Sequence, residues 1–365
     1  MSIRQSYLLA SRLRPRRSTM FVPGVNNKAL SKVRTALSCD SFIVDLEDAV
    51  ASNAKDHARD NVATFLSTKA PSRNLHQREI MVRINALDTP WGLADLSMVS
   101  AANGVDTVAV PKVETASDVW RVERHLNEMA RQHEHEHHHP ATASSTASST
   151  ASSTASSTAS SSSSPTPSTK TSSTTLTATS VAATSYATDP TPMGIACMIE
   201  TPLGVLNAAE IASASDNVVC LIVGTSDLTN DLNALHTSTR EPMMSSLGMC
   251  VLAARAHGVA VLDGVHLNLS NAEEFAAHCE QGRAMGFDGK TLIHPKQVDM
   301  ANSTFGPNEM DVNNARRIVQ AFEAAEARGE GVCVVDGQLV ENLHAEGARR
   351  LLFFADQIQR VEQSS

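Results

Sequence analysis

Apolar residues along this chain gather in short runs, and between the runs lie amphipathic segments with apolar positions at helical spacing. The runs end in Gly, Pro or a charged residue and are rich in Val and Ile, which is typical of buried strands in a parallel sheet. There are eight of them: Ser18–Gly24, Ser41–Asp48, Glu79–Asn85, Asp106–Lys112, Gly194–Glu200, Cys220–Asp227, Val259–Val265 and Gly289–Pro295. The clearest helical segments are Ala54–Leu66, Ala116–Arg131, Glu241–His257 and Asn271–Gly286.

This alternation of strand and helix predicts an α/β fold with parallel strands. Eight such units predict a closed (β/α)8 TIM barrel, for which roughly 250 residues is the usual size. An open doubly wound sheet is the alternative, but no Gly-rich phosphate-binding fingerprint follows any of the runs. The pattern therefore favours the barrel.

Two acids at the ends of neighbouring runs are the strongest candidates for chemistry. Glu200 closes GIACMIE and Asp227 follows CLIVG. The carboxyl ends of the strands are where such barrels hold their active sites, and two carboxylates there suit a hard cation, most plausibly Mg²⁺. The simpler interpretation is that each acid caps the helix that follows it.

The other predicted strands also end in polar or special residues, which favours a site over isolated helix caps. They are Pro23, Asp45, Glu47, Arg83, Asn85, Lys112, Glu114, Asp263 and His294. Burying so many charged groups without partners would cost several kcal/mol each, so they must pair, bind an ion or face a ligand.

Composition narrows the class of protein. The chain has 365 residues, 42% of them hydrophobic, and a net charge of −9, which argues against nucleic acid or an anionic membrane as the main partner. Six cysteines without a CxxC pair are typical of reduced thiols in an intracellular protein. No apolar run approaches the length of a membrane span.

Two segments do not follow the barrel pattern. Residues 132–190 pass from a His/Glu tract into Ser/Thr-rich repeats with almost no large apolar residue, so we expect a disordered insertion on the amino-terminal face of the barrel. Residues 1–16 contain Arg4, Arg12, Arg14 and Arg16 and no acid, which is the composition of a mitochondrial presequence. We therefore predict a mitochondrial protein, or otherwise a cytoplasmic one.

Longer motifs carry a specific likeness. They are RRSTMFVPG, DLEDAV, VRINALDTPWGLADL, VAVPKVETASDV, IETPLGVLNAAEIA, VGTSDLTNDL, GFDGKTLIHPKQV and VDGQLVENLHAEGARR. In this order, they resemble the CitE-like branch of the HpcH/HpaI aldolase superfamily, which includes the citrate lyase β subunit, malyl-CoA and citramalyl-CoA lyases and malyl-CoA thioesterase. The resemblance places the barrel at 17–131 and 191–300 and a C-terminal helical extension at 301–365 that packs on a neighbouring subunit.

The resemblance implies roles for individual residues. Glu200 and Asp227 would bind Mg²⁺, Arg83 would hold the substrate carboxylate and the developing enolate, and Asp45 and Glu47 would bond the metal's waters and orient Arg83. The positions that would contact coenzyme A are Phe21, Lys28, His294 and Pro295, although a structural role suits Lys28 and His294 equally well.

The same resemblance implies a proton-transfer carboxylate from another subunit. Glu341 aligns with that position, where several lyases have Asp, and Asp336 is a nearby alternative. The protein would then be a homo-oligomer, a trimer or hexamer.

The implied activity is a Mg²⁺-dependent lyase that reversibly cleaves a malyl-, citramalyl- or citryl-like acyl-CoA to acetyl-CoA, or a homologue, and a 2-keto acid. A malyl-CoA thioesterase of the same family is the first alternative. A non-catalytic CoA-binding barrel and an aldolase that acts on free hydroxy-keto acids are the others.

Overall fold

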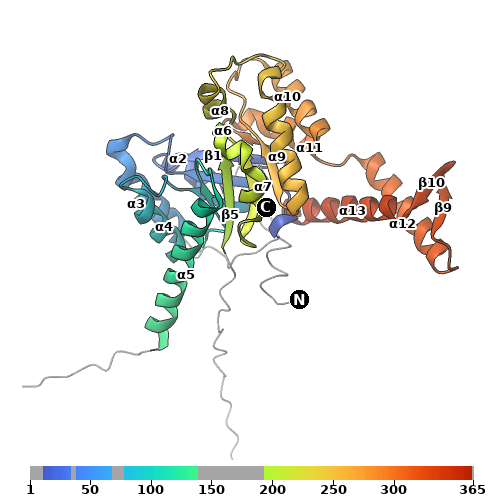
Figure 1. The fold of residues 1–365 in the computed structure, drawn as a ribbon, viewed down its shortest axis with the longest axis horizontal. Helices are drawn as coiled ribbons and strands as arrows, with labels where there is room; N and C mark the ends of the chain where they lie inside the picture. The colour runs from blue at the N-terminus through green and yellow to red at the C-terminus, as the bar shows by residue number, and fades with distance from the viewer. Residues whose placement is uncertain (1–10, 34–37, 68–77, 103, 139–192, 364–365) are drawn as a thin grey trace, which may run out of the picture.

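The computed structural model describes residues 11–33, 38–67, 78–102, 104–138 and 193–363. Eight parallel strands form a closed barrel in which consecutive strands pair and the last pairs with the first (Figure 1). They are β1 (Ser18–Pro23), β2 (Ser41–Asp45), β3 (Glu79–Arg83), β4 (Thr107–Val110), β5 (Gly194–Ile199), β6 (Val218–Val223), β7 (Ala260–Asp263) and β8 (Gly289–Leu292). Every predicted apolar run is a strand, and the (β/α)8 prediction is confirmed.

Helices surround this barrel, between consecutive strands or after the last one. They are α2 (Asn27–Lys32), α3 (Lys55–Ser67), α4 (Gly92–Ala101), α5 (Ala116–His138), α6 (Pro202–Leu206), α7 (Ala208–Ser213), α8 (Thr225–Asp231), α9 (Met244–His257), α10 (Ala272–Met285) and α11 (Val298–Phe305). Short 3₁₀ turns, η1 (Ser52–Ala54), η2 (Glu241–Met243) and η3 (Pro295–Gln297), lead into α3, α9 and α11.

Alternation along the strands decides which side chains reach the interior. Ile43, Met81 and Met198 belong to a buried cluster inside the barrel, whereas their chain neighbours pack in the larger cluster beneath the helices. Two positions after each of these interior residues stand Asp45, Arg83 and Glu200. The same alternation therefore directs these three polar side chains into the mouth at the carboxyl ends of the strands.

Helix α5 runs through His138, so residues 132–138 continue the helix instead of belonging to the low-complexity insertion. Residues 139–190, for which we predicted disorder, lie outside the described part of the chain. The end of α5 and the start of β5 lie on the amino-terminal side of the barrel (Figure 1). The described residues on either side of the insertion therefore lie at the end opposite the mouth.

Arg16 closes the amino-terminal face of the barrel. Its Nε and Nη2 donate to the two carboxylate oxygens of Glu79 at 2.7 and 2.8 Å, and both side chains are fully buried. Thr107 Oγ1 donates to the same carboxylate at 2.8 Å. Burial alone would raise the pKa of Glu79, but Arg16 and Arg14 lower it below its ordinary value.

The neighbouring arginines also bind polar groups at the amino-terminal face, either carbonyls or carboxylates. Arg12 donates to the carbonyl of Val218, Arg14 pairs with Asp106 at 3.1 Å, and Arg17 pairs with Asp40 at 2.8 Å. The arginines that suggested a targeting peptide are thus part of the barrel floor from residue 12 onward. Residues 1–10 lie outside the described residues.

The C-terminal segment forms an arm that extends sideways from the barrel (Figure 1). It consists of α12 (Glu309–Glu326), a hairpin of β9 (Val332–Val335) and β10 (Gln338–Glu341), and the returning helix α13 (Asn342–Gln363). The hairpin, which was not predicted, turns through Asp336 and Gly337, both with positive φ, as a two-residue type I′ turn requires. Helix α11 contacts β8 and α10, so the arm begins after Phe305 and not at residue 301.

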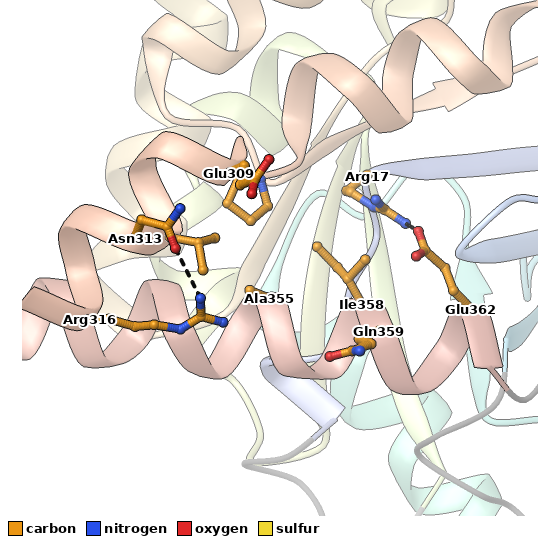
Figure 2. Close-up of a pocket in the computed structure, with 10 residues that line it drawn as sticks. Arg17, Glu309, Asn313, Arg316, Ala355, Ile358, Gln359 and Glu362 are labelled. Atoms are coloured by element: carbon orange, nitrogen blue, oxygen red, sulfur yellow. Dashed lines mark hydrogen bonds and ion pairs between the residues drawn. The ribbon is translucent and has the colours of Figure 1, made fainter.

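The root of the arm is fixed to the floor. Arg17 Nη2 lies 3.1 Å from Glu362 Oε1 near the end of α13. Beside this pair lies an open hollow of about 610 Å³, lined by residues of α12, α13 and the floor that include Arg17, Glu309, Arg316 and Glu362 (Figure 2). The hollow lies at the amino-terminal end of the barrel and is separate from the site described next.

Among the described residues, every helix is too short or too polar to cross a lipid bilayer.

Candidate functional site

Arg83 lies at the centre of the mouth. It ends β3 directly beside Asp45, the last residue of β2. Its Nε and Nη2 donate to the two carboxylate oxygens of Asp45 at 2.7 and 2.6 Å, while Nη1 lies 2.8 Å from Glu47 and 3.1 Å from Asp48. Burial alone would lower the pKa of Arg83, but these carboxylates raise it, so the guanidinium stays charged in a fixed orientation.

Phe21 packs on this guanidinium. The ring of Phe21, on β1, lies 4.9 Å from Arg83 Cζ in a cation–π arrangement and reaches into the interior cluster. In the described contacts Phe21 therefore orients Arg83. Its expected contact with coenzyme A stays a prediction.

The turn that carries Glu47 is held from both sides. Asp45 accepts the backbone N–H of Glu47 at 2.9 Å and that of Ala49 at 3.1 Å. Lys55, which is buried, donates to the carbonyls of Leu46 and Glu47 at 3.0 and 2.7 Å. Sequence reasoning gave Lys55, the first residue of α3, no role.

A second buried network supports the same turn. Asp95, on α4, accepts from the backbone and side-chain nitrogens of Asn85 at 3.0 and 2.6 Å and from Arg59 at 2.7 Å. Asn85 in turn donates to the carbonyl of Leu46 at 2.9 Å. The VRIN and GLADL motifs thus fix the loop after β3 against the loop after β2, a pairing that neither motif reveals alone.

Glu200 ends β5 and is buried in the mouth. Its Oε1 accepts the backbone N–H of Lys112 at 2.8 Å. Gly224 lies so close that a Cβ at that position would overlap the carboxylate of Glu200. The glycine that ends CLIVG is therefore required for space. Thr201, and not Glu200, caps helix α6, so the helix-cap interpretation is wrong for Glu200.

Asp227 lies in the first turn of α8 and is about one-third exposed. A carboxylate in this position interacts favourably with the helix dipole, but Gly224 is the N-cap of α8 and no side chain caps that helix, so the helix-cap interpretation is wrong for Asp227 as well. Asp227 Oδ2 also lies 3.3 Å from Nζ of Lys112, the residue whose backbone holds Glu200. Lys112 thus connects the two acids.

Carboxylates outnumber cations at this end of the barrel. Burial, with further contributions from Asp48, Glu200 and Asp45, raises the pKa of Glu47 to about 8 in spite of Arg83. Burial likewise raises the pKa of Glu200 to about 7, and Asp227 adds to the shift. One oxygen of Glu47 is buried without an aligned hydrogen bond, although Arg83 Nη1 lies 2.8 Å away. Each of these features would be relieved by an added cation.

The donor set fits magnesium. Among the described residues, no three His, Cys, Asp or Glu side chains gather closely enough to enclose an ion by themselves. Mg²⁺, however, usually keeps several waters and takes only one or two protein carboxylates together with substrate oxygens. Glu200 and Asp227, which Lys112 connects, supply two such carboxylates.

Asp263, although it ends a strand, does not belong to the site at the mouth. Asp263 follows the interior residue Leu262 by one position and lies beside Gly282 of α10, and Lys290 of β8 and Arg240, just before η2, donate to it at 2.7 and 2.8 Å. Its partners lower its pKa although burial alone would raise it. It is a buried structural acid behind the barrel wall.

The expected contacts of coenzyme A are spread around the rim. His294 caps η3 by accepting from Lys296 N at 3.1 Å, and Pro295 is the first residue of that turn. Lys28 is exposed on α2 after the carboxyl end of β1. His294 and Pro295 thus have a structural role at the rim, and ligand binding by all three residues stays a prediction.

Glu341 does not reach the mouth of its own barrel. It ends β10 at the far end of the arm and is exposed (Figure 1). Asp336, the alternative, lies in the hairpin turn and pairs with Arg317 at 2.8 Å. Within one chain, the structure brings together Asp45, Glu47, Arg83, Glu200 and Asp227 but not these two acids.

Known proteins with the same fold and motifs were found by comparison. The HpcH/HpaI aldolase/citrate lyase family model matches residues 17–295. The chain is 36% identical over 350 residues to a (3S)-malyl-CoA thioesterase of Cereibacter sphaeroides (strain KD131 / KCTC 12085), with 96% of this chain and 98% of that protein covered. It is 32% identical over 346 residues to the citrate lyase subunit beta of Leuconostoc mesenteroides subsp. cremoris, with 94% of each covered.

A solved structure supports the same fold. The protein CitE from Mycobacterium tuberculosis, in complex with magnesium, acetoacetate and coenzyme A, matches with a TM-score of 0.61 and 23% sequence identity. The match covers 94% of this chain and 99% of that one.

Proposed function

Because the chain belongs to the HpcH/HpaI aldolase/citrate lyase family, as its motifs indicated, we propose that it is a Mg²⁺-dependent acyl-CoA lyase. It would reversibly cleave a malyl-, citramalyl- or citryl-like thioester into acetyl-CoA, or a homologue, and a 2-keto acid. The observation that carries the proposal is the fixed guanidinium of Arg83 beside an excess of buried carboxylates. Cleavage of this kind needs positive charge at a developing enolate and a cation at the keto acid.

Glu200 and Asp227 would hold the metal. When bound, Mg²⁺ would lower the pKa of the substrate hydroxyl and polarise the emerging carbonyl. The close contact of Glu200 with Gly224, where a Cβ would not fit, and its hydrogen bond from Lys112 would keep the carboxylate in one orientation.

Arg83 would stabilise the enolate oxygen of the acyl-CoA. Asp45 fixes two of its nitrogens, so the charge is in place before the reaction begins and needs little reorganisation. Glu47 would exchange hydrogen bonds with water or substrate at the mouth, and its raised pKa would let it carry a proton there. Phe21 covers one face of the guanidinium and would exclude water from it.

The arm would complete the site of a neighbouring subunit. Glu341 would transfer the proton at the acetyl-CoA methyl group, and the position of β10, which it ends, far from its own barrel supports action in trans. The active form would be a homo-oligomer, a trimer or hexamer, and a monomer would be nearly inactive. Mixing Arg83→Ala subunits with Glu341→Gln subunits tests this, because mixed oligomers would regain sites with both residues intact, whereas sites built from one chain would not.

Coenzyme A would lie across the rim. Lys28 on α2 would supply positive charge for its phosphates, and His294 and Pro295 after β8 and Phe21 beside Arg83 would contact the rest of the molecule. Mitochondrial import stays a prediction from N-terminal composition, and its support is weaker because Arg12–Arg17 have structural partners.

A (3S)-malyl-CoA thioesterase is the second candidate. The observation in its favour is the 36% identity to a protein of that name over 96% of this chain. Such an enzyme would bind the same ester at the same residues and direct water to the thioester carbonyl.

The test is a panel of malyl-, citramalyl- and citryl-CoA with purified protein and Mg²⁺, in which free thiol and keto acid are followed together. Keto acid with acetyl-CoA would establish the lyase and identify its substrate. Free CoA with intact hydroxy acid would establish the thioesterase. Equal turnover of the free acids would favour an aldolase, and no Mg²⁺-dependent turnover, with Asp227→Ala as control, would favour a CoA-binding protein.

A further inference from the structure

Lys112 contacts both acids of the proposed metal pair. Its backbone N–H donates to Glu200 Oε1 at 2.8 Å, and its Nζ lies 3.3 Å from Asp227 Oδ2. It follows β4, so it reaches across the mouth from the strand next to the one that ends at Glu200. No other cation among the described residues forms an ion pair with Asp227.

The backbone of Lys112 is in an uncommon conformation. Its φ is 49°, in the left-handed region that residues with a Cβ seldom adopt. Such strain persists only where the surroundings enforce it and is concentrated at functional sites. Here the conformation points the N–H at Glu200 while the side chain turns toward Asp227, so one residue serves both acids.

The ion pair between Lys112 and Asp227 has a consequence for metal binding. Nζ of Lys112 and a divalent cation need the same Asp227 carboxylate. We propose that Lys112 is an internal counter-ion that holds Asp227 while the metal site is empty and gives it up when Mg²⁺ binds. The inference rests on the proposed roles of Glu200 and Asp227, and it makes Lys112 a positioning residue that sets the metal affinity of the site.

The solvent exposure of Lys112 and Asp227 sets the size of the expected change in Mg²⁺ affinity. The side chains of Lys112 and Asp227 are 49% and 36% exposed, so their ion pair is screened by water. Pairs of this kind contribute at most about 1 kcal/mol, which corresponds to an affinity change of about two- to fivefold.

The experiment is calorimetric titration of the metal-free full-length protein with MgCl₂. Lys112→Met keeps the backbone N–H and removes the ammonium, so it should bind Mg²⁺ about two- to fivefold more tightly than the unmodified chain. Lys32→Met, an equal charge change on the exposed end of α2, should leave the affinity unchanged. Lys112→Gly suits the positive φ and should match Lys112→Met in affinity while unfolding at a higher temperature.

The Asp227→Ala variant distinguishes failure of the metal-ligand proposal from failure of the counter-ion inference. If it binds Mg²⁺ as the unmodified chain does, the metal-ligand proposal fails whatever Lys112 does. If Asp227→Ala loses Mg²⁺ but both Lys112 variants bind it with unchanged or weaker affinity, the counter-ion inference alone is overturned. Loss of a merely structural residue would not tighten metal binding.

Discussion

The two ends of the barrel both contain buried arginine–carboxylate ion pairs, but these pairs serve different purposes. At the floor, Arg14, Arg16 and Arg17 each pair with one buried carboxylate, Arg17 also reaches the exposed Glu362, and the pKa of Glu79 is lowered. At the mouth, Arg83 is shared among three carboxylates, and the pKa of Glu47 is raised to about 8. Balanced charges at the floor stabilise the fold, whereas the excess of carboxylates at the mouth favours binding of a cation.

The largest expected effect is on catalysis at the mouth. Arg83→Ala should lower kcat by about 10²–10³-fold, since it removes a fixed charge at the reacting atoms. Steady-state kinetics on the substrate found in the acyl-CoA panel measure this. The Arg83→Lys variant should recover little activity, because an ammonium group cannot reproduce the two-point bond to Asp45. Near-normal turnover in both variants would remove Arg83 from the mechanism.

The matched change at the floor should affect folding instead. Arg16→Met leaves Glu79 buried without its counter-charge and should lower the free energy of unfolding by about 3–5 kcal/mol. Denaturant titration measures it, and the double variant Arg16→Met with Glu79→Met should regain most of the loss. If Arg16→Met were as stable as the unmodified chain, the floor ion pairs would not have the structural role proposed for them.

The two ends should also respond oppositely to pH. The folded pKa of Glu47 lies above its ordinary value of 4.5, so its contribution to stability is present below pH 4.5 and is lost as the pH rises toward 8. The folded pKa of Glu79 is depressed, so its contribution is present above pH 4.5 and is lost as the pH falls through the folded pKa.

Thermal unfolding in EDTA tests this contrast. Between about pH 5 and 8, the metal-free protein should lose more stability than its Glu47→Gln variant, and Mg²⁺ should stabilise it more at the upper end of this range than at the lower. Parallel profiles of the two proteins would contradict the raised pKa of Glu47.

A smaller effect is expected from the support of the mouth. Lys55→Met removes the donor to two buried carbonyls and should cost about 1–3 kcal/mol in the free energy of unfolding, with a fall in kcat because the Glu47 turn loosens. Lys32→Met is the control. A change in stability without a change in kcat would show that Lys55 supports the fold alone.

The smallest effect is expected from the insertion. Replacing residues 139–190 with a short Gly/Ser linker should change kcat by less than about twofold, because both flanking elements lie at the floor end and loop length contributes only logarithmically to stability. A large loss of kcat would show that the insertion reaches the mouth.

The barrel and the centre of its site were predictable because both depend on local pattern. Most strands consist largely of apolar residues, and each site acid stands at a strand end or within four positions after it. Asp263 was the exception that the same pattern could have excluded, since it follows interior Leu262 by one position, whereas Glu200 follows interior Met198 by two.

The supporting residues could not be predicted, because their partners are distant in the chain. Arg12 bonds the carbonyl of Val218, 206 positions away, and Arg16 bonds Glu79, 63 positions away. Such contacts exist only after the strands have been arranged in order. Composition alone therefore made these arginines resemble a targeting peptide.

The closure of β1 against β8 also affects how the chain is made. Gly289 lies against the backbone of Arg16, and Thr19 and Met20 pair with Thr291 and Leu292. At about 5–20 residues per second, the ribosome would take roughly tens of seconds to supply β8 after β1 has emerged. Throughout that interval β1 has one unpaired edge, which is a template for aggregation. Newly made chains of this protein should therefore depend on chaperones until the last strand arrives.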